Sequence, residues 1–488
     1  MQLTAEQLNM IETAKANAKK RGSVTTYRGA AGTGKTTSIK TLVAELMEEW
    51  PNLRIAIIAP TNKAAKVLAR SSGLPVTTIH RRFLTGTTYR MVPKQGWLLE
   101  LQALQVCAEV AKRDGAVGEE AINIMAGALL RRLEKKMEWE VRKGDDDDDV
   151  DVIIVDEGSM VGDKLITDLR KVQALYGGPA LLIFGDNHQL PPVKDVDWFG
   201  KTAAVAGLTQ VHRQAKGNPA LDFATKVRET QSFPIDWHTR FQGQGVDLLE
   251  EVYINGGAII SLRNTTRVMV NLQFRAVKLK HKTHLPVVGD RIALEAWDRN
   301  QLTNGTLLHV KEVVDVGLLR VTDEDGKEHL VSPLFEFYYD DPKMGLPEVA
   351  AVQMRAWDAH SMFAATEANQ YKRDLADAFD KAVRELQHSA APGKLEDEAT
   401  ALAKSRVAMP DINPAWLELE GVRTKAFYAY CITCHKAQGS QYPVVVVINE
   451  VWASMENAYR WVYTAATRVQ TRLVAVKDYD QMLKWIRQ

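Results

Sequence analysis

Four short runs of apolar, mostly β-branched residues occur in the first half of the chain, and each ends at a turn-like residue. They are Val24–Tyr27, Ile55–Ala59, Val152–Val155 and Leu181–Phe184. A segment with the character of a loop or helix follows each run, and this alternation is typical of buried parallel strands in an α/β sheet. Because open α/β sheets bind ligands beyond the carboxyl ends of their strands, we expect the chemistry to lie in the loops that follow.

Three further runs of the same kind lie far downstream and predict a second parallel sheet. They are Ala258–Leu262, Val444–Ile448 and Leu473–Val476. A second sheet fits the length of 488 residues, since single hydrophobic cores stop growing at about 250–300 residues.

Two stretches of different character interrupt the sheets, and we expect both to be insertions. The first, from about Thr85 to Lys143, has apolar residues at helical spacing and predicts mainly helices. These residues are Leu98, Leu101, Leu104, Val110, Ile122, Met125, Leu129 and Leu133. The second begins with Leu285–Val331, whose short alternating segments predict a small barrel, and continues into a charged helical stretch, Glu348–Glu418.

Composition narrows the class of protein. With 45% hydrophobic residues the chain is not disordered, and 62 basic against 61 acidic residues exclude attraction of a partner by bulk charge. No run approaches the roughly 18 apolar residues of a membrane span, and Met1–Lys20 has the polar helical character of mature protein. Three cysteines are too few for a disulfide framework. We therefore expect a soluble, cytoplasmic protein.

The strongest motif follows the first predicted strand. Gly29-Ala-Ala-Gly32-Thr33-Gly34-Lys35-Thr36 fits the P-loop pattern G-x-x-x-x-G-K-[ST] and precedes a predicted helix, Thr37–Glu48. The glycines let backbone N–H groups turn toward phosphates, the lysine reaches the β and γ oxygens, and the threonine hydroxyl ligates Mg²⁺. The alternative is a glycine turn with a chance lysine.

A P-loop also needs a second anchor for the metal and a group that activates water, and an acidic pair supplies both. Asp156 and Glu157 come directly after the strand Val152–Val155. Asp156 is expected to anchor the metal, and Glu157 to orient or deprotonate the attacking water. A surface acidic pair is the alternative. Together the two motifs predict a nucleoside-triphosphate hydrolase.

Two other clusters invite a metal or cofactor reading that we do not favour. Asp145–Asp149 is a run of like charges, which is typical of a solvated loop. Cys431-Ile-Thr-Cys434-His435 has the spacing of c-type haem attachment, but it is a single copy without an export signal, and a zinc site lacks a second pair of ligands.

Nine blocks in order along the chain resemble superfamily 1 helicases of the 5′→3′ branch, the Dda and RecD-like group. The blocks are Leu3-Thr-Ala-Glu-Gln7, the P-loop, Ala59-Pro-Thr-Asn-Lys63-Ala-Ala65, Thr77-Thr-Ile-His80, Asp156-Glu-Gly-Ser159, Gly185-Asp-Asn-His-Gln189-Leu-Pro-Pro192, Leu208-Thr-Gln-Val-His-Arg213-Gln214, Thr433-Cys-His435-Lys-Ala-Gln438-Gly-Ser440 and Tyr463-Thr-Ala-Ala-Thr-Arg468.

The resemblance implies two RecA-like P-loop domains with parallel sheets that grip ATP between them. The first would comprise residues 1–84 and 150–205, and the second residues 206–284 and 421–488. It also implies a mainly helical insertion that carries a pin, residues 85–149, and an SH3-like barrel insertion with a helical extension or tower, residues 285–420.

The resemblance assigns further roles at the nucleotide. Arg213 and Arg468 would bring positive charge to the γ-phosphate from the second domain, unless each serves only in a salt bridge. Gln189 would sense the γ-phosphate. Gln7 would read adenine, although Thr4-x-x-Gln7 is also a capping box. The residues expected to bind the nucleotide are Gln7, Gly29, Gly32, Thr33, Gly34, Lys35, Thr36, Thr37, Gly439 and Gln441. At Gln441 relatives often carry a glutamate for the ribose.

Expected contacts to nucleic acid are local, since the net charge is only +1. Short hydroxyl, amide and cationic groups hold phosphates without reading bases. The candidates are Pro60, Thr61, Asn62, Lys63, Thr78, His80, Arg81, Thr433, His435 and Lys436. For His80 a hydrogen-bonded core position is the alternative. Tyr89 and Trp97 are candidate pin aromatics that stack on bases, with core packing as the alternative for each.

The sequence thus predicts an ATP- and Mg²⁺-dependent DNA helicase that moves 5′→3′ on single-stranded DNA and unwinds tailed duplex. Its polarity rests on the resemblance alone. We expect it to act as a monomer away from membranes, in replication or recombination, with replication or single-strand-binding proteins as candidate partners. The rival hypotheses are an ATPase that displaces bound proteins and a helicase that acts on RNA.

Overall fold

The structure is a computed structural model, and it describes most of the two predicted sheet regions. The described residues are 3–93, 133–141, 149–193, 195–211, 218–243, 245–254, 256–295, 302, 305–315, 318–331, 333–335, 348–363, 425–452 and 455–487. The chain divides into two compact units. The larger holds Met1–Phe83, Val141–Ser361 and Gly421–Gln488, and the smaller holds Leu84–Glu140 and Met362–Glu420.

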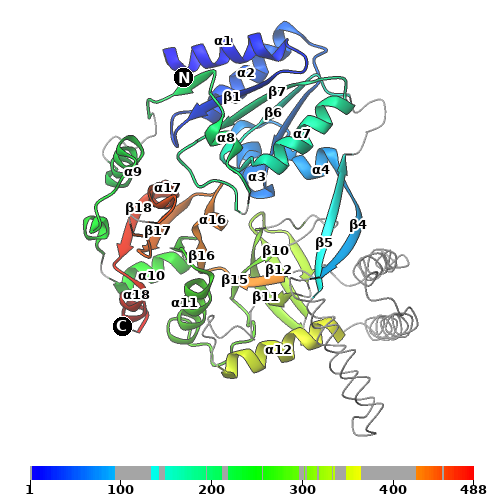
Figure 1. Cartoon of the computed structure of the whole chain (residues 1–488). Coiled ribbons are helices and arrows are strands. Elements are labelled where there is room, and N and C mark those ends of the chain that lie inside the picture. Colours follow the sequence, from blue (N-terminus) through cyan, green and yellow to red (C-terminus); the bar gives the residue numbers. More distant parts are fainter. Residues whose placement is uncertain are drawn as a thin grey trace, which may run out of the picture. The chain divides into compact units, whose positions relative to one another are not determined.

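The first sheet has six described strands, all parallel, in the order β3-β2-β6-β7-β1-β8 (Figure 1). They are β1 (Val24–Gly29), β2 (Ile55–Ala59), β3 (Thr77–Thr78), β6 (Val152–Val155), β7 (Ala180–Gly185) and β8 (Ala206–Leu208). The four predicted runs form β1, β2, β6 and β7, so these predictions are confirmed. The other two strands are too short to leave a hydrophobic pattern in the sequence.

Helices cover the first sheet and form its core. They are α1 (Ala5–Ala18), α2 (Lys35–Glu49), α3 (Asn62–Ser72), α4 (Ile79–Phe83), α7 (Asp163–Leu175) and α8 (Trp198–Lys201), with a 3₁₀ turn at Gly158–Met160. Met10 of α1 and Leu42 of α2 are buried against Ile154 and Leu182 of the sheet. Helix α2 confirms the predicted helix and begins two residues earlier.

The second sheet has four described strands, also parallel, in the order β16-β9-β17-β18. They are β9 (Ala258–Ser261), β16 (Cys431–Thr433), β17 (Tyr442–Ile448) and β18 (Val469–Val476). Successive side chains of a strand point to opposite faces. Val444 and Val446 therefore join one hydrophobic core, and Val445 and Val447 join the other. Burial on both faces explains the continuous apolar run.

Two groups of helices provide those two cores. Helices α10 (Gly245–Ile254), α11 (Asn264–Val277) and α18 (Tyr479–Arg487) contribute to the first core. Helices α9 (Pro219–Thr230) and α17 (Ala458–Ala466), with a 3₁₀ turn at Trp237–Phe241 and the short helix α16 (Cys434–Ala437), contribute to the second.

A third sheet forms from the predicted barrel region and has the described order β13-β12-β11-β10-β15-β14. Its strands are β10 (Arg291–Glu295), β11 (Leu307–Asp315), β12 (Leu318–Asp323), β13 (Glu328–Val331), β14 (Leu334–Phe335) and β15 (Lys425–Tyr428). Strands β10 to β13 and the pair β10–β15 are antiparallel. Helix α12 (Glu348–Phe363) buries Met354 and Trp357 in the core that this sheet shares with the second sheet.

One expectation for the first insertion is wrong. Residues Leu84–Pro93 (β4) and Leu133–Val141 (β5) are strands that pair in a two-stranded sheet, whereas Leu133 was expected in a helix. Apolar Met137, Trp139 and Val141 alternate with Glu138 and Glu140, which is the period of a strand. The other helical residues predicted there lie outside the described residues, as does the predicted helical stretch beyond 363. Among the described residues, no helix is both long and apolar enough to cross a bilayer.

A buried ion pair joins helix α11 to the start of the third sheet. Arg275 and Asp290 are 1% and 0% exposed, and their side chains approach to 2.7 Å. Arg275 also donates hydrogen bonds to the carbonyls of His284 and Leu285, and its guanidinium lies 3.8 Å from the ring centre of Tyr428 in β15. The pair therefore fixes the junction between the second and third sheets.

We predict that Asp290→Ala lowers the free energy of unfolding by about 3–5 kcal/mol, because it leaves the Arg275 charge buried without its counterion. Urea unfolding at neutral pH measures the change. The matched control is Arg320→Ala, which breaks an exposed pair with Glu312 in the same sheet and should change stability little. Equal losses from both variants would contradict this account.

Candidate nucleotide and nucleic-acid site

The P-loop lies between the carboxyl end of β1 and the start of α2. Gly32 and Gly34 have positive φ angles of 81° and 87°, which glycine adopts without strain. A Cβ at Gly34 would collide with the side-chain amide of Gln7. The Lys35 ammonium group donates hydrogen bonds to the carbonyls of Gly29 (2.6 Å) and Ala30 (3.2 Å). The lysine thus lies over the loop that is expected to hold phosphates. Thr36 and Thr37 follow it in the first turn of α2, where N–H groups favour an anion.

Gln7 caps helix α1 and also contacts the P-loop. Thr4 and Gln7 form the predicted capping box, with the Thr4 backbone N–H donating to the side-chain Oε1 of Gln7 at 3.0 Å. The Gln7 side-chain N–H donates to the Thr33 carbonyl at 3.2 Å. Capping is therefore confirmed, and contact with adenine stays a prediction.

Asp156 and Glu157 lie at the end of β6. Burial raises the pKa of Asp156 to about 6; repulsion by Glu157 adds to this rise and attraction by Lys35 opposes it. The Glu157 N–H donates to the Asp156 carboxylate at 2.8 Å. Glu157 has a φ of 54°, an uncommon conformation for a residue other than glycine. Such strain is found at functional sites, which fits a role for the pair in chemistry.

The loop after β7 brings Asp186 and Gln189 to the same edge of the sheet. Asp186 is 1% exposed and accepts the N–H of Ala31 in the P-loop at 3.0 Å. Gln189 is 3% exposed, and its side-chain oxygen has no hydrogen-bond partner among the described residues. The same holds for the buried Ser159 and Ser440 hydroxyls. Buried polar atoms without partners are rare and costly, so they indicate groups that a ligand or water satisfies.

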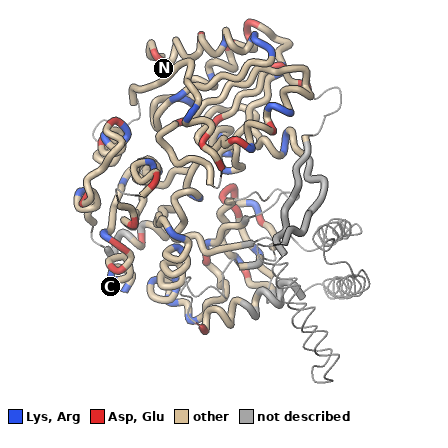
Figure 2. Tube along the Cα trace, in the orientation of Figure 1, with Lys and Arg blue, Asp and Glu red and all other residues tan. Residues whose placement is uncertain are grey.

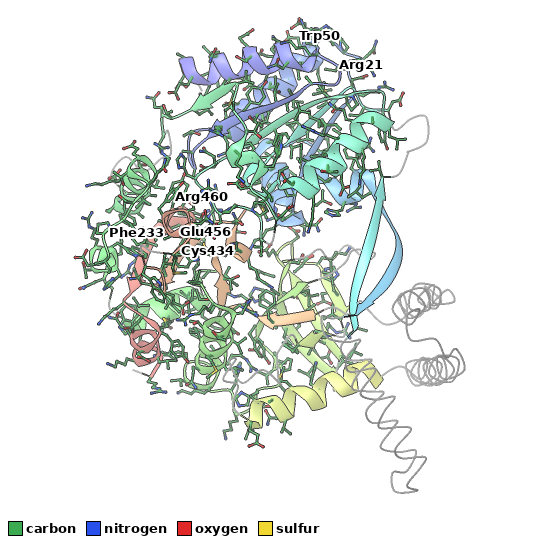
Figure 3. The ribbon with its side chains drawn as sticks, viewed as in Figure 1. Arg21, Trp50, Phe233, Cys434, Glu456 and Arg460 are labelled. Carbon is green, nitrogen blue, oxygen red and sulfur yellow. The ribbon has the colours of Figure 1, made fainter. Side chains whose placement is uncertain are left out.

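Residues of α17 and of the turn after α16, which pack on the second sheet, reach these loops directly. The Ala31 N–H also donates to the Tyr463 hydroxyl oxygen at 3.0 Å, and Ala31 packs against the second sheet's core. The Gln438 side chain donates to the Leu190 carbonyl at 2.9 Å. Arg460 of α17, labelled in Figure 3, forms an ion pair with Asp197 at 2.6 Å. The P-loop therefore contacts groups from both parallel sheets.

Arg468 lies at the end of the last matched block and is 4% exposed. Its guanidinium donates to the carbonyls of Thr464 (3.0 Å) and Ser440 (3.2 Å) and to the Thr467 hydroxyl (3.1 Å). These contacts hold the arginine beside the Gln438–Ser440 turn. Its role as a cation at the γ-phosphate stays a prediction. Arg213 lies outside the described residues.

The other two candidate nucleotide residues lie in and beside that turn. Gly439 has a φ of 72°, and a Cβ there would approach Ala64 of the first sheet's helix α3 to 3.2 Å. Gln441 is half-buried and precedes Tyr442 of β17. The glycine therefore allows a close approach between this turn and helix α3.

The first-sheet candidates for nucleic-acid contact follow β2 and β3. Pro60 and Asn62 flank Thr61, whose hydroxyl caps α3. The Lys63 ammonium group donates to the Tyr442 hydroxyl of the second sheet at 2.9 Å.

At the end of β3, the Thr78 hydroxyl accepts the N–H of Arg81. Burial lowers the pKa of His80, with Asp168 opposing, so this imidazole is favoured in its neutral form. It would then meet a phosphate as a neutral hydrogen-bond donor.

The second-sheet candidates Thr433, His435 and Lys436 follow β16. Thr433 is buried, and burial lowers the pKa of His435. The Lys436 ammonium lies 4.1 Å from the ring centre of Phe427. Basic and acidic residues are interspersed along the described chain, in keeping with local contacts (Figure 2). Tyr89 lies in β4, and Trp97 lies outside the described residues.

The structure describes both cysteines of the Cys431–His435 string and the end of the acidic run. Cys431 and Cys434, the second labelled in Figure 3, are fully buried. Burial raises the pKa of each thiol to about 12, so neither is a ready thiolate ligand. In the described part of the chain, no group of three or more metal-ligating side chains comes together. At the end of the acidic run, Asp149 is exposed and pairs with Arg54 at 3.0 Å.

Sequence reasoning assigned no role to four residues that the structure brings to the site. Asp186 and Tyr463 stand inside matched blocks, so their positions carried a signal. Tyr442 and Arg460 lie just outside such blocks, and their contacts with the first sheet leave no local pattern.

Comparisons with known proteins agree with this arrangement. Residues 2–239 match the AAA domain family, and residues 428–476 match the UvrD-like helicase C-terminal domain. The chain is 30% identical over 199 residues to the ATP-dependent RecD2 DNA helicase of Deinococcus radiodurans. The aligned region covers 40% of this chain and 20% of the relative. It is 27% identical over 230 residues to the ATP-dependent DNA helicase RRM3 of Saccharomyces cerevisiae, covering 43% and 25%.

The matched part thus spans about a fifth and a quarter of these two relatives. A solved structure of Bacteroides Pif1 bound to single-stranded DNA has the same fold, with a TM-score of 0.51, 16% identity, and coverage of 97% of this chain and 92% of that one. The AAA match contains the P-loop, and the helicase match contains the Gln438–Ser440 turn and Arg468. In these two regions the chain is similar to superfamily 1 helicases of the Pif1, RecD and Dda type.

Proposed function

We propose that this protein is an ATP-dependent DNA helicase that translocates 5′→3′ on single-stranded DNA and unwinds duplex. One observation carries the proposal: the Ala31 N–H of the P-loop donates a hydrogen bond to the hydroxyl of Tyr463 in helix α17, which packs on the second parallel sheet. A phosphate site in contact with two sheets can couple cleavage of a phosphate bond to movement of one sheet against the other. The names of the relatives and the match of residues 428–476 to the UvrD-like helicase C-terminal domain support this function.

ATP would bind as substrate at the edge where β1, β6 and β7 end. The P-loop amides and Lys35 would hold its phosphates, and Gln7 would contact the base. Glu157 would orient the attacking water, and Gln189 would respond to loss of the γ-phosphate. Arg468 and Arg213 would supply positive charge from the second sheet's side.

The donor set at this edge fits Mg²⁺. Thr36 offers a hydroxyl and Asp156 a carboxylate, and oxygen is the ligand that Mg²⁺ prefers. Burial beside Glu157 disfavours ionised Asp156, and a divalent cation would offset that cost. When bound, the metal would neutralise charge on the phosphate oxygens.

Single-stranded DNA would lie along the loops after β2, β3 and β16. Hydroxyl, amide and cationic groups there suit phosphates, so we propose binding that does not depend on base sequence. We further propose that 1–84 with 150–205 and 206–284 with 421–488 are the RecA-like domains. At the edges of these ranges, β8 (Ala206–Leu208) pairs with β1 of the first sheet and β15 (Lys425–Tyr428) pairs with β10 of the third sheet. In this proposal, 85–149 carries the strand-separating pin, and 285–420 forms an SH3-like barrel with a tower.

A tailed-duplex assay tests the function. With ATP and Mg²⁺, we expect strand separation of DNA carrying a 5′ single-stranded tail and none of DNA carrying only a 3′ tail. Unwinding from the 3′ tail alone would contradict the polarity, and preference for a tailed RNA duplex would contradict the substrate. Stimulated ATPase without any strand separation would favour a protein-displacing ATPase.

The variant Lys35→Ala is the control for that assay. It should remove ATP hydrolysis and unwinding while single-stranded DNA still binds, because the lysine contacts the P-loop and not the proposed DNA track. Lys40→Ala on the exposed side of the same helix should retain both activities. Retained turnover in Lys35→Ala would refute the nucleotide site.

We predict that Arg468→Ala slows ATP hydrolysis by on the order of 10³-fold or more, as loss of a transition-state cation does. Arg468 also donates hydrogen bonds to Thr464, Ser440 and Thr467, so its loss can destabilise the fold. The rate is therefore normalised to the folded fraction measured by circular dichroism. Arg472→Ala, an exposed arginine of β18, is the control. If Arg468→Ala slowed ATP hydrolysis only twofold, the role of Arg468 would be structural and not catalytic.

We predict that Asp156→Asn stabilises the fold in a pH-dependent way while impairing ATP hydrolysis. The folded pKa of about 6 lies above the ordinary value of 3.8, so the wild type loses stability as pH rises from about 4 to about 6. The variant avoids this loss, which we expect to be about 1–3 kcal/mol at pH 7. Urea unfolding in EDTA at pH 4 and pH 7 measures it. A constant difference between the two proteins at both pH values would contradict the buried charge.

A further inference from the structure

The Asp186 carboxylate is a meeting point of three chain segments. Four neutral groups donate hydrogen bonds to it: the N–H of Ala31 in the P-loop at 3.0 Å, the N–H of His188 at 3.1 Å, the side chain of Gln189 at 3.5 Å and the hydroxyl of Tyr463 at 2.6 Å. A buried carboxylate depends on such donors, since removing one leaves charge without compensation.

Tyr463 is the donor that comes from the second sheet's side. It lies in α17, is 2% exposed, and its hydroxyl also accepts the Ala31 N–H at 3.0 Å. Burial raises the pKa of Tyr463 well above 10, and the nearby Asp186 charge adds to the rise. The phenol therefore stays protonated at physiological pH and donates a hydrogen bond to the carboxylate.

The next residue of α17 contacts the other end of the same loop. The Thr464 hydroxyl accepts the N–H of Leu190 at 3.0 Å. Two consecutive side chains of the helix therefore hold the loop at residues 186 and 190, and Gln189 lies between these two points. A shift of α17 would move the Gln189 amide, because both ends of its short loop are attached to the helix.

We propose that Tyr463 is a positioning residue that transmits movement of the second sheet to the phosphate site through Asp186. The hydrogen bond from its hydroxyl fixes the position of the Asp186 carboxylate. The carboxylate in turn orients the Ala31 amide and the Gln189 side chain toward the phosphates. This inference rests on the proposed function and adds to it the link by which the two sheets communicate.

If Tyr463 served only to pack the core, loss of its hydroxyl would leave ATP turnover unchanged. The ring packs in the second sheet's core, so Tyr463→Phe keeps the packing and removes only the hydroxyl. Tyr459→Phe is the matched control, because Tyr459 lies one turn earlier on the same helix and its ring contacts His188 edge-on. Both variants are compared with the wild type as full-length protein.

Three readouts separate the roles: thermal unfolding, equilibrium binding of a fluorescent ADP analogue, and ATP turnover at saturating ATP with and without single-stranded DNA. For Tyr463→Phe we expect nucleotide affinity within about threefold of wild type and DNA-stimulated turnover reduced by about tenfold or more, as small misplacements of catalytic groups cause. Tyr459→Phe should stay within about twofold in every readout. Turnover of Tyr463→Phe within twofold of wild type would overturn the proposal.

A double-mutant cycle with Asp186→Asn tests whether the two residues act through one bond. We expect the double variant to be no slower than the slower single variant, whereas independent roles would multiply the losses and overturn the proposal. Should Tyr463→Phe fail to fold, Thr464→Val tests the other attachment, and a wild-type rate for it would overturn the proposal. If the wild type itself shows no DNA-stimulated turnover, the proposed function has failed instead.

Discussion

Parallel strands deliver all their carboxyl ends to one edge of a sheet, and this geometric constraint determines the site. Strands β1, β6 and β7 bring the P-loop, the Asp156–Glu157 pair and the Asp186–Gln189 loop to that edge. Strands β2 and β3 bring the proposed DNA contacts to the same edge. The proposed nucleotide and polynucleotide sites are therefore neighbours for topological reasons, and a second sheet that contacts this edge can respond to both.

Several features of the site oppose stability. Asp156 is buried beside another carboxylate, Glu157 has left-handed backbone geometry, and Gln189 buries an oxygen that no described group satisfies. Each feature costs free energy in the folded protein. Selection for stability alone would remove these features. Their presence together at one edge therefore supports a role in binding and chemistry.

The local parts of this arrangement could be predicted from sequence, and the long-range parts could not. Strand β1 and the P-loop are adjacent in the chain, so hydrophobic pattern and motif identified both. The contact between Ala31 and Tyr463 joins residues 432 positions apart, and no periodicity reports such a pair. Leu133 was predicted to lie in a helix because a single apolar residue at helical spacing also fits the end of a strand. The alternation of apolar and polar residues that follows it indicates the strand. Gln7 shows that two roles can share one side chain, since it caps a helix and contacts the P-loop at once.

The central claim is that ATP binding moves the two parallel sheets relative to each other. Energy transfer between dyes on the two sheets tests it most directly, with cysteines at positions 40 and 472 in a Cys107→Ser protein, since Cys431 and Cys434 are buried. The account predicts that a non-hydrolysable ATP analogue with Mg²⁺ changes the transfer efficiency, and that Lys35→Ala abolishes this change. Unchanged transfer in a protein that still hydrolyses ATP would contradict it.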